Sequence, residues 1–367
     1  MNQNKTTSRE PLFHVVKRPE RSGRQMLLFR LGAVALSILA GGLFILAIGY
    51  NPIEIYGTIL NGAFRSKIAV QSTIKITIPL CISALGATLA FKMKFWNIGG
   101  EGQIIMGGVF ATYFALFHAD WPHLPLMIVC FLAGLIGGGL WGLIPALFKV
   151  KWNTNETLLT LMLNYIALYI ISWLQNGPWR DPTANGFPKI AAFAKSAVLG
   201  KVLGVQAGWI VMLVFTVLVW VYLKFTKQGY EVAVVGESQD TARYAGIHVK
   251  KVILRTMFLS GAIGGVCGML QACGTDATLS TGIAGGVGFT AIIVAWLCQL
   301  NPGMILVVSF LFGVLEKGSG VVQSSYGLST DCAAVLQGII LFFILASEFF
   351  VRYAFAGRSS AKGGKKA

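Results

Sequence analysis

The chain has 367 residues and a net charge of +16, with 30 Lys and Arg against 14 Asp and Glu, yet 55% of its residues are hydrophobic and only 12% are charged. Soluble chains carry roughly 25% charged residues, and nucleic-acid-binding proteins spread their basic residues over a hydrated surface without apolar runs of about 20 residues. The composition therefore argues against an aqueous enzyme and a nucleic-acid partner, and it indicates an integral protein of the lipid bilayer.

Residues 1–26 are polar, basic and contain two prolines. They lack an apolar region followed by a small-residue cleavage site, so they predict a cytosolic tail in front of an uncleaved helix rather than a signal peptide. A second basic cytosolic tail is expected at 352–367.

Between the tails, apolar segments recur at lengths that suit a bilayer core of about 30 Å, which a helix crosses with roughly 20 residues. We predict an all-α, polytopic membrane domain over 27–351 with about ten transmembrane helices, within a range of nine to eleven. Glycines near 95–103, and the short segments around Asn301 and Pro302, predict broken or short helices near 95–103 and 286–302. The ten segments are 27–50, 68–91, 97–117, 124–148, 156–174, 208–225, 253–272, 286–300, 303–317 and 333–351.

The distribution of basic residues predicts the orientation, because cytoplasmic loops retain Lys and Arg. With both termini inside, 22 of the 30 basic residues lie on the cytoplasmic side. The polar insert at 175–207 is then extracellular. The sequence does not decide whether this insert meets a soluble partner, caps a pore or is a passive lid.

Polar residues at membrane depth are costly and usually face the interior of a bundle or a water path. Asn97, Glu101 and Gln103 follow the inner pair Lys92 and Lys94 closely enough to lie inside the hydrocarbon region. Two roles stay open for Glu101. It is either a structural brace that accepts backbone N–H groups from a broken helix, or a group in the translocation pathway.

The segment after Asn155 carries a second polar pattern, in which Glu156, Thr160 and Asn164 recur every four residues and so share one helix face. Asn155 is suited to cap this helix. Asn164 is not explained by capping, and we expect it to line a pore or to bond to another subunit. Glycine faces at 134, 138 and 142 and at 261, 264, 265 and 268 are typical of close helix packing.

The cytosolic loop from Gly229 to Ile247 predicts a short helix, with Ser238 as its N-cap and Gly246 as its stop. A rigid helix outside the membrane suits docking into another protein. A connector resting on lipid headgroups is the alternative, weakened by the small residues at 242, 245 and 246.

Four ordered stretches carry a resemblance: Trp96 to Gln103, Asn155 to Ile166, Gly236 to Ile247, and Gly288-Phe289 with Asn301-Pro302. Together they resemble the permease subunits of bacterial ABC importers for simple sugars and nucleosides, a ribose-type family similar to branched-chain amino-acid permeases. The resemblance covers roughly residues 30–350. The chain departs from the usual family pattern at Ala233, at Ser238-Gln239 and at Thr290, where Arg, Asn-Pro and an acidic residue are usual.

The resemblance implies a multi-pass subunit of the bacterial cell membrane that works with a second homologous permease, a cytosolic ATPase and an extracellular solute-binding lipoprotein. ATP and Mg would bind to the ATPase, and this chain would have no catalytic residues, metal or cofactor of its own. The loop 226–255 would couple to the ATPase through Gly229, Gly236, Asp240, Ala242, Arg243, Tyr244, Gly246 and Ile247. The pathway or polar core would contain Asn97, Glu101, Gln103, Glu156, Thr160, Asn164 and Phe289.

Bulky residues at Ala242 and Gly246 are then predicted to abolish transport and ATPase coupling without preventing membrane insertion. A nucleoside is the first choice of substrate and a pentose or other simple sugar the second. The main alternative is an ion-coupled secondary transporter of a small polar solute, in which Glu101 and Lys75 carry the coupling ions. A membrane-embedded enzyme would need a convergent set of catalytic side chains, and the sequence shows none.

Overall fold

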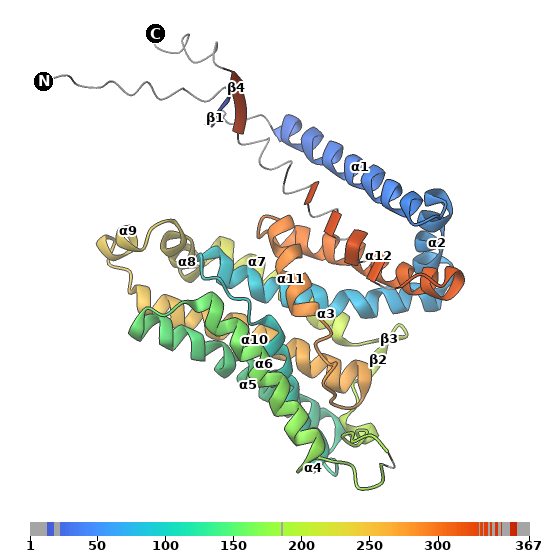
Figure 1. Cartoon of the computed structure of the whole chain (residues 1–367). Helices are drawn as coiled ribbons and strands as arrows, with labels where there is room; N and C mark the ends of the chain where they lie inside the picture. The colour runs from blue at the N-terminus through green and yellow to red at the C-terminus, as the bar shows by residue number, and fades with distance from the viewer. Residues whose placement is uncertain are drawn as a thin grey trace, which may run out of the picture. The chain divides into compact units, whose positions relative to one another are not determined.

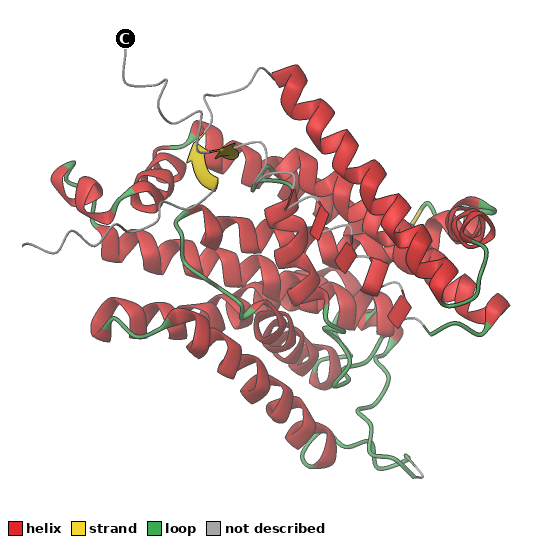
Figure 2. Ribbon diagram, turned by 45° about the horizontal axis from the view of Figure 1, so that its top comes forward, coloured by secondary structure: helices red, strands yellow, loops and turns green. Residues whose placement is uncertain are grey.

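The computed structural model describes the backbone of residues 13–17, 23–184, 186–329 and 353–357, with short stretches between 331 and 346, and describes side chains from residue 32 onward outside 353–357. Helices make up most of this chain (Figures 1 and 2). The chain divides into two compact units, one formed by Met1–Tyr56 with Ser329–Ala367 and the other by Gly57–Leu328. Each unit is described by itself.

The first unit contains β1 (Phe13–Lys17), α1 (Gly23–Ala47), the start of α2 (Pro52–Phe64) and β4 (Tyr353–Gly357). The two strands pair in antiparallel fashion, with Phe13 opposite Gly357. The hydroxyl of Tyr56 donates to the carbonyl of Ile38 at 2.8 Å, which ties the start of α2 to α1. Helix α2 was not predicted, because Glu54 and Asn61 interrupt its apolar pattern.

The second unit is a bundle of helices that carries the site. Its longest elements are α3 (Lys67–Lys92), α4 (Gly100–Phe117), α5 (His123–Trp152), α6 (Glu156–Asn176), α7 (Gly208–Phe225), α10 (Val249–Leu270) and α12 (Pro302–Tyr326). The shorter elements are η1 (Lys195–Ala197), β2 (Lys201–Val202), β3 (Val205–Gln206), α8 (Lys227–Glu237), α9 (Gln239–Tyr244), the π-helix η2 (Gln271–Asp276) and α11 (Val287–Leu297).

Helix α10 lies at the centre of this unit and packs against α3, α4 and α5 (Figure 1). The predicted glycine faces make the contact. A Cβ atom at Gly265 would overlap the carbonyl of Gly134, and one at Gly138 would overlap the carbonyl of Gly261. Backbones that approach this closely need glycine, so the glycines determine how α5 and α10 cross.

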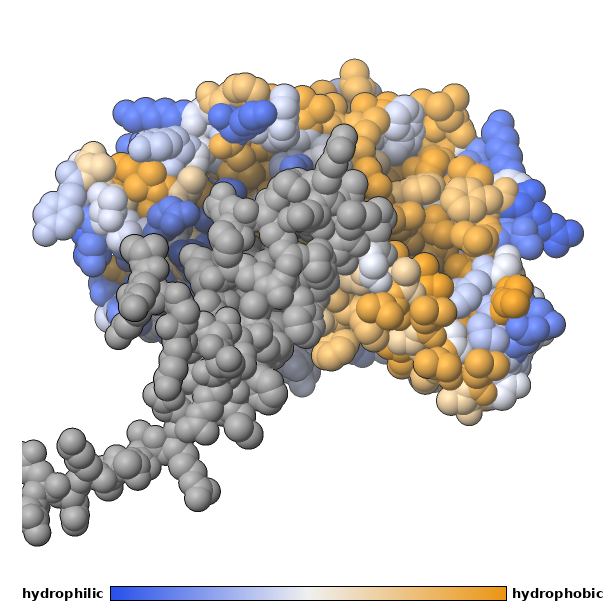
Figure 3. Space-filling model, turned by 90° about the horizontal axis from the view of Figure 1, so that it is seen from above, coloured by the Kyte–Doolittle hydropathy of each residue, from blue (hydrophilic) through white to orange (hydrophobic). Residues whose placement is uncertain are grey.

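The outer face of the bundle is apolar, as a bilayer requires. On α5 the exposed side chains Ile128, Leu132, Ile136 and Leu140 form one stripe, and Figure 3 shows broad hydrophobic areas on the visible face. Among the described residues, six helices are long and apolar enough to cross a membrane, or seven when α1 and α2 count as one broken span. The prediction of about ten helices is therefore not confirmed, and its tenth segment, 333–351, falls largely outside the described residues.

Several predicted boundaries differ from those of the helices. The irregular stretch expected at 95–103 ends at Gly99, since α4 is a regular helix from Gly100. Helix α12 continues to Tyr326 instead of stopping at 317, because polar residues after Leu315 interrupt the hydropathy but not the helix. Helix α10 begins at Val249 rather than at 253. The short helix predicted near 286–302 is confirmed as α11, which has 11 residues.

Candidate functional site

Five of the residues predicted for the pathway or polar core come together inside the bundle, where Ser260 joins them. We call this set the polar cluster; its members are Asn97, Glu101, Gln103, Thr160, Asn164 and Ser260. Each is at most 8% exposed. They come from the turn between α3 and α4, from α4, from α6 and from α10. Burial inside protein confirms that the polar face of α6 turns away from lipid, as its spacing predicted.

The polar face of α6 holds the turn between α3 and α4. Asn164 accepts from the backbone N–H of Gly102 at 2.8 Å and donates to the carbonyl of Ile98 at 2.9 Å. The hydroxyl of Thr160 accepts from the N–H of Ile98 at 3.2 Å. Backbone groups at membrane depth have no water to bond with, and α6 supplies the missing partners.

The side chain of Glu101 reaches the start of α11. Its Oε1 atom accepts from the backbone N–H of Gly288 at 2.6 Å. The N-terminus of a helix carries partial positive charge and unbonded N–H groups, so a carboxylate is favourable there. A Cβ atom at Gly288 would overlap the backbone N of Glu101, which explains why this position is glycine. Of the two roles left open by the sequence, this geometry matches the structural brace.

Asn97 and Gln103 form a reciprocal amide pair. Asn97 Nδ2 donates to Gln103 Oε1 at 3.4 Å, and Gln103 Nε2 donates to Asn97 Oδ1 at 3.3 Å. Asn97 also donates to Ser260 Oγ at 3.4 Å, and Ser260 donates to the carbonyl of Gly86 at 2.7 Å. The cavity beside them measures about 10 Å³, enough for about one water molecule. In this conformation the cluster bonds to itself and is not open to a solute.

Two predicted members lie apart from the polar cluster. Glu156 forms an ion pair with Lys149 at 2.9 Å, which joins the start of α6 to the end of α5. Phe289 follows Gly288 in the chain, but its side chain is 43% exposed. The four-residue spacing placed Glu156 on the correct helix face, although the partner on α5 was not foreseen.

The coupling segment, residues 226–255, contains α8 and α9. Ser238 accepts from the N–H of Thr241 at 3.2 Å and caps α9. Gly246 follows α9 with a φ of 76°, a left-handed value that ends a helix and suits glycine. The short helix predicted between Ser238 and Gly246 is therefore confirmed.

The predicted coupling residues divide into an inner and an outer set. Ala242 is fully buried in a small hydrophobic core with Met93 and Val249, so the small-residue surface expected there does not include it. Gly229 packs against the backbone at the end of α7, and Gly236 packs against the carbonyl of Lys92. A six-residue helix has no periodic pattern from which this inward face could have been predicted.

The outer set contains Asp240, Arg243, Tyr244 and Gly246. Asp240 and Arg243 form an exposed ion pair at 3.1 Å, and Tyr244 is 94% exposed. Ile247 is half-buried. The surface of the coupling segment that another protein can reach is thus charged and aromatic.

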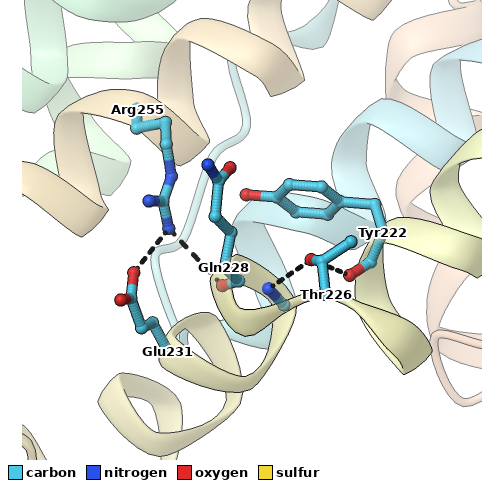
Figure 4. Close-up of polar contacts among 6 residues, drawn as sticks. Tyr222, Thr226, Gln228, Glu231 and Arg255 are labelled. Atoms are coloured by element: carbon cyan, nitrogen blue, oxygen red, sulfur yellow. Dashed lines mark hydrogen bonds and ion pairs between the residues drawn. The ribbon is translucent and has the colours of Figure 1, made fainter.

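Sequence reasoning missed a second ion pair in the coupling segment. Arg255 Nη2 on α10 contacts Glu231 Oε2 on α8 at 3.1 Å and donates to the carbonyl of Gln228 at 3.4 Å (Figure 4). The two residues are 24 positions apart on different helices, and no spacing rule links them.

At the other end of α10, the insert at 175–207 is bonded to the bundle. The N–H of Leu199 donates to the carbonyl of Cys273 at 2.7 Å, and the N–H of Phe193 donates to the carbonyl of Ala277 at 2.7 Å. These bonds satisfy carbonyls around the π-helix η2. On the insert, hydrogen bonds from the hydroxyl and backbone N–H of Thr183 lower the pKa of Asp181, and Lys189 lowers it further.

Comparison with known proteins identifies the family of the chain. A family model described as the permease component of branched-chain amino acid transport systems matches residues 69–345. The glucose ABC transporter permease protein TsgB13 of Haloferax volcanii is 30% identical over 339 residues, which cover 88% of this chain and 89% of the relative. The guanosine ABC transporter permease protein NupP of Bacillus subtilis is 31% identical, with 92% and 97% covered. The nucleoside ABC transporter permease protein NupB of Lactococcus lactis is 29% identical, with 91% and 96% covered.

The matched region includes both the polar cluster and the coupling segment. Such permeases are multi-pass membrane proteins that transport a solute and do not catalyse a reaction themselves. The chain belongs to the family of ABC transporter permease subunits described as the branched-chain amino acid transport system permease component.

Proposed function

We propose that this chain, paired with a second homologous permease, forms the pathway of an ABC importer and docks a cytosolic ATPase through the outer set of α9. The observation that carries the proposal is α9 itself, a capped helix with Asp240, Arg243 and Tyr244 exposed. A protruding aromatic and charged tip is typical of the few residues that dominate a protein interface. ATP and Mg belong to the ATPase in this proposal.

The orientation follows from charge and from the ends of the bundle. Both termini are inside, since 22 of the 30 basic residues then lie on the cytoplasmic side. Figure 1 places α9 and the β2–β3 hairpin at opposite ends of the second unit, which supports opposite sides of the membrane for them. The insert at 175–207 then faces an extracellular solute-binding lipoprotein.

The transported solute in this proposal is uncharged, with a nucleoside first and a simple sugar second. The names of NupP, NupB and TsgB13 support both classes. The polar cluster supports a neutral solute, because the N-terminus of α11 already holds the carboxylate of Glu101. A half-membrane helix that received an anionic solute would leave its N-terminus free.

The test is uptake by proteoliposomes that contain the complete transporter, with the ATPase identified by co-purification. Labelled guanosine and uridine are compared with ribose and glucose, and a nucleoside monophosphate serves as the charged control. We expect ATP-dependent uptake of at least one neutral solute and none of the monophosphate. Uptake that needs a proton or sodium gradient and no ATPase would contradict the proposal and favour the secondary transporter.

A further inference from the structure

The ion pair between α8 and α10 differs from an ordinary surface pair. The side chains of Arg255 and Glu231 are only 24% and 19% exposed, whereas those of Arg243 and Asp240 are 65% and 80% exposed. Exposed pairs such as Arg243 and Asp240 contribute little to stability. Removing one partner of a largely buried pair leaves an uncompensated charge. Loss of Arg255 or Glu231 is therefore expected to disturb the structure more.

The surroundings of Arg255 contain further buried polar groups without well-formed hydrogen bonds. Among the described residues, these are Arg255 Nε and the hydroxyls of Tyr222 and Thr256, which lie close to one another. Figure 4 shows Tyr222 and Thr226 from the end of α7 in the same region, with Thr226 bonded to the carbonyl of Tyr222 at 2.6 Å. Buried polar groups without well-formed hydrogen bonds are rare in proteins, and one explanation is a second arrangement that uses them.

Helix α10 connects this pair to the polar cluster. Ser260 lies five residues after Arg255 on the same helix, about one and a half turns away. Ser260 bonds to Asn97 and to the carbonyl of Gly86, and Gly264 packs against Gln103. A rigid helix therefore runs from the pair to the buried amides.

The connection between α8 and α9 is also short. Helix α8 carries Glu231 and leads to Ser238, which caps α9. A displacement of α9 reaches α8 through one residue between the two helices. From α8, the charged contact to α10 is the ion pair with Arg255.

We propose that Glu231 and Arg255 are a positioning pair for energy coupling. The pair fixes α8 to α10, so that movement of α9 on the ATPase shifts α10 and rearranges the polar cluster. This inference rests on the proposed function, because it assumes that α9 docks the ATPase. Neither residue touches the solute or ATP in this scheme.

The chain offers a matched control in Lys149 and Glu156. Their distance is 2.9 Å and their side chains are 24% and 14% exposed, close to the values of the proposed pair. They join the end of α5 to the start of α6, and neither residue belongs to α8, α9 or α10. A general effect of losing a half-buried ion pair therefore appears equally in both pairs, whereas an effect on coupling appears in one.

The experiment compares E231Q, R255Q and the reversed pair E231R/R255E with K149Q in the complete transporter. Uptake and ATP hydrolysis are measured together in proteoliposomes. For E231Q and R255Q we expect the uptake per ATP to fall by about tenfold, within the usual range for coupling between two sites, while ATP hydrolysis continues. The reversed pair is expected to recover most of the uptake per ATP, and K149Q is expected to keep the wild-type value.

A cross-link provides a measurement within a single protein. In E231C/R255C, a short bismaleimide linker is expected to restore the uptake per ATP that the unlinked protein has lost, because the linker again fixes α8 to α10. An unchanged ratio in E231Q and R255Q, an equal loss in K149Q, or a linked protein that stays uncoupled would overturn the inference. If the wild-type chain binds no ATPase, the proposed function fails instead.

Discussion

Glu101 and Glu231 are both carboxylates that join two helices, but they are held in different ways. Glu101 in the polar cluster bonds to a backbone N–H at a glycine that cannot be replaced without a clash. Glu231 in the coupling segment bonds to the flexible side chain of Arg255, next to buried polar groups without well-formed hydrogen bonds. A bond to the backbone at a close contact allows one arrangement, whereas a bond between two side chains allows several. The comparison assigns rigidity to the backbone contact between α4 and α11, and a link that side chains alone maintain to α8 and α10.

The largest effect is expected from G288V, which tests the rigidity of the contact between α4 and α11. The added side chain would overlap the backbone of Gly100 and Glu101, so the backbone of α4 or α11 would have to shift. We expect a loss of roughly 3 kcal/mol or more in the free energy of unfolding. The measurement is the yield of monodisperse protein after extraction in detergent, together with its melting temperature.

The control for this prediction is G282A in the loop before α11. Its added Cβ atom would meet only the hydroxyl of Ser280 at 3.8 Å, and its φ does not favour glycine. It is expected to keep the wild-type yield. A G288V protein as stable as G282A would mean that α4 and α11 are not in rigid contact.

The next effect concerns the amide of Asn164. In N164A the N–H of Gly102 and the carbonyl of Ile98 lose their partners at membrane depth. The expected loss is about 2 kcal/mol in the free energy of unfolding, since each orphaned group costs about 1 to 3 kcal/mol and water fills part of the gap. Unfolding in mixed micelles measures it.

N176A serves as the comparison on the same helix. Asn176 lies at the exposed end of α6 and donates to the carbonyl of Ser172. Since water can replace this bond, N176A is expected to unfold like the wild type. Equal losses in the two variants would show that the position of the amide in the membrane is unimportant.

The coupling segment is expected to respond in the opposite sense, with a loss of binding rather than of stability. In Y244A the exposed ring at the tip of α9 is removed without any loss of buried surface. We expect the affinity for the ATPase to fall by about 2 kcal/mol, or roughly 30-fold, as for an interface anchor. Binding of the purified ATPase to the permease in nanodiscs measures the change.

Two further variants serve as comparisons for Y244A. Y230A removes a ring that is 65% exposed on α8, outside the tip, and is expected to bind normally. A242L enlarges a fully buried residue, so it is expected to lower the stability of the coupling segment as well as transport. An unchanged affinity in Y244A would place the docking surface elsewhere.

The sequence predicted those features whose causes are local. The caps by Asn155 and Ser238 are confirmed because an N-cap depends on residues within one turn. The bounds of α7 agree with the apolar segment at 208–225, since length and hydropathy decide where such a helix crosses a bilayer. Helix α2 was missed because its polar residues interrupt the apolar run.

Features that depend on distant parts of the chain were beyond the sequence. The partner of Glu101 is 187 residues away. A bond from a backbone N–H to Glu101 was one of the two predicted roles, but Gly288 was not identified as the donor. The pairing of Arg255 with Glu231 depends on how α8 packs against α10. The burial of Ala242 depends on the same packing, which a single sequence does not reveal.

The smallest effect is expected at Asp181 on the insert at 175–207, which is outside both regions. Hydrogen bonds from Thr183, helped by the charge of Lys189, lower the pKa of this carboxyl. The folded loop therefore binds a proton less readily than the unfolded loop, and the carboxylate favours the folded loop at neutral pH. As the pH falls, this contribution begins to decline near the ordinary pKa of Asp and is lost once the pH passes below the lowered one.

Cleavage of the loop by pepsin tests this sign, because pepsin works across that acidic range. In the wild type, cleavage between 181 and 189 is expected to increase as the pH falls through the acidic range, whereas in D181N it is expected to be raised throughout and to vary less with pH. Because Asp181 lies on the surface, where water and salt screen its interactions, the melting temperature of the whole protein should not change. Identical cleavage profiles for the two proteins would show that the bonds to Thr183 do not order the loop. A lower melting temperature in D181N would mean that the insert supports the bundle through η2 more strongly than an exposed turn allows.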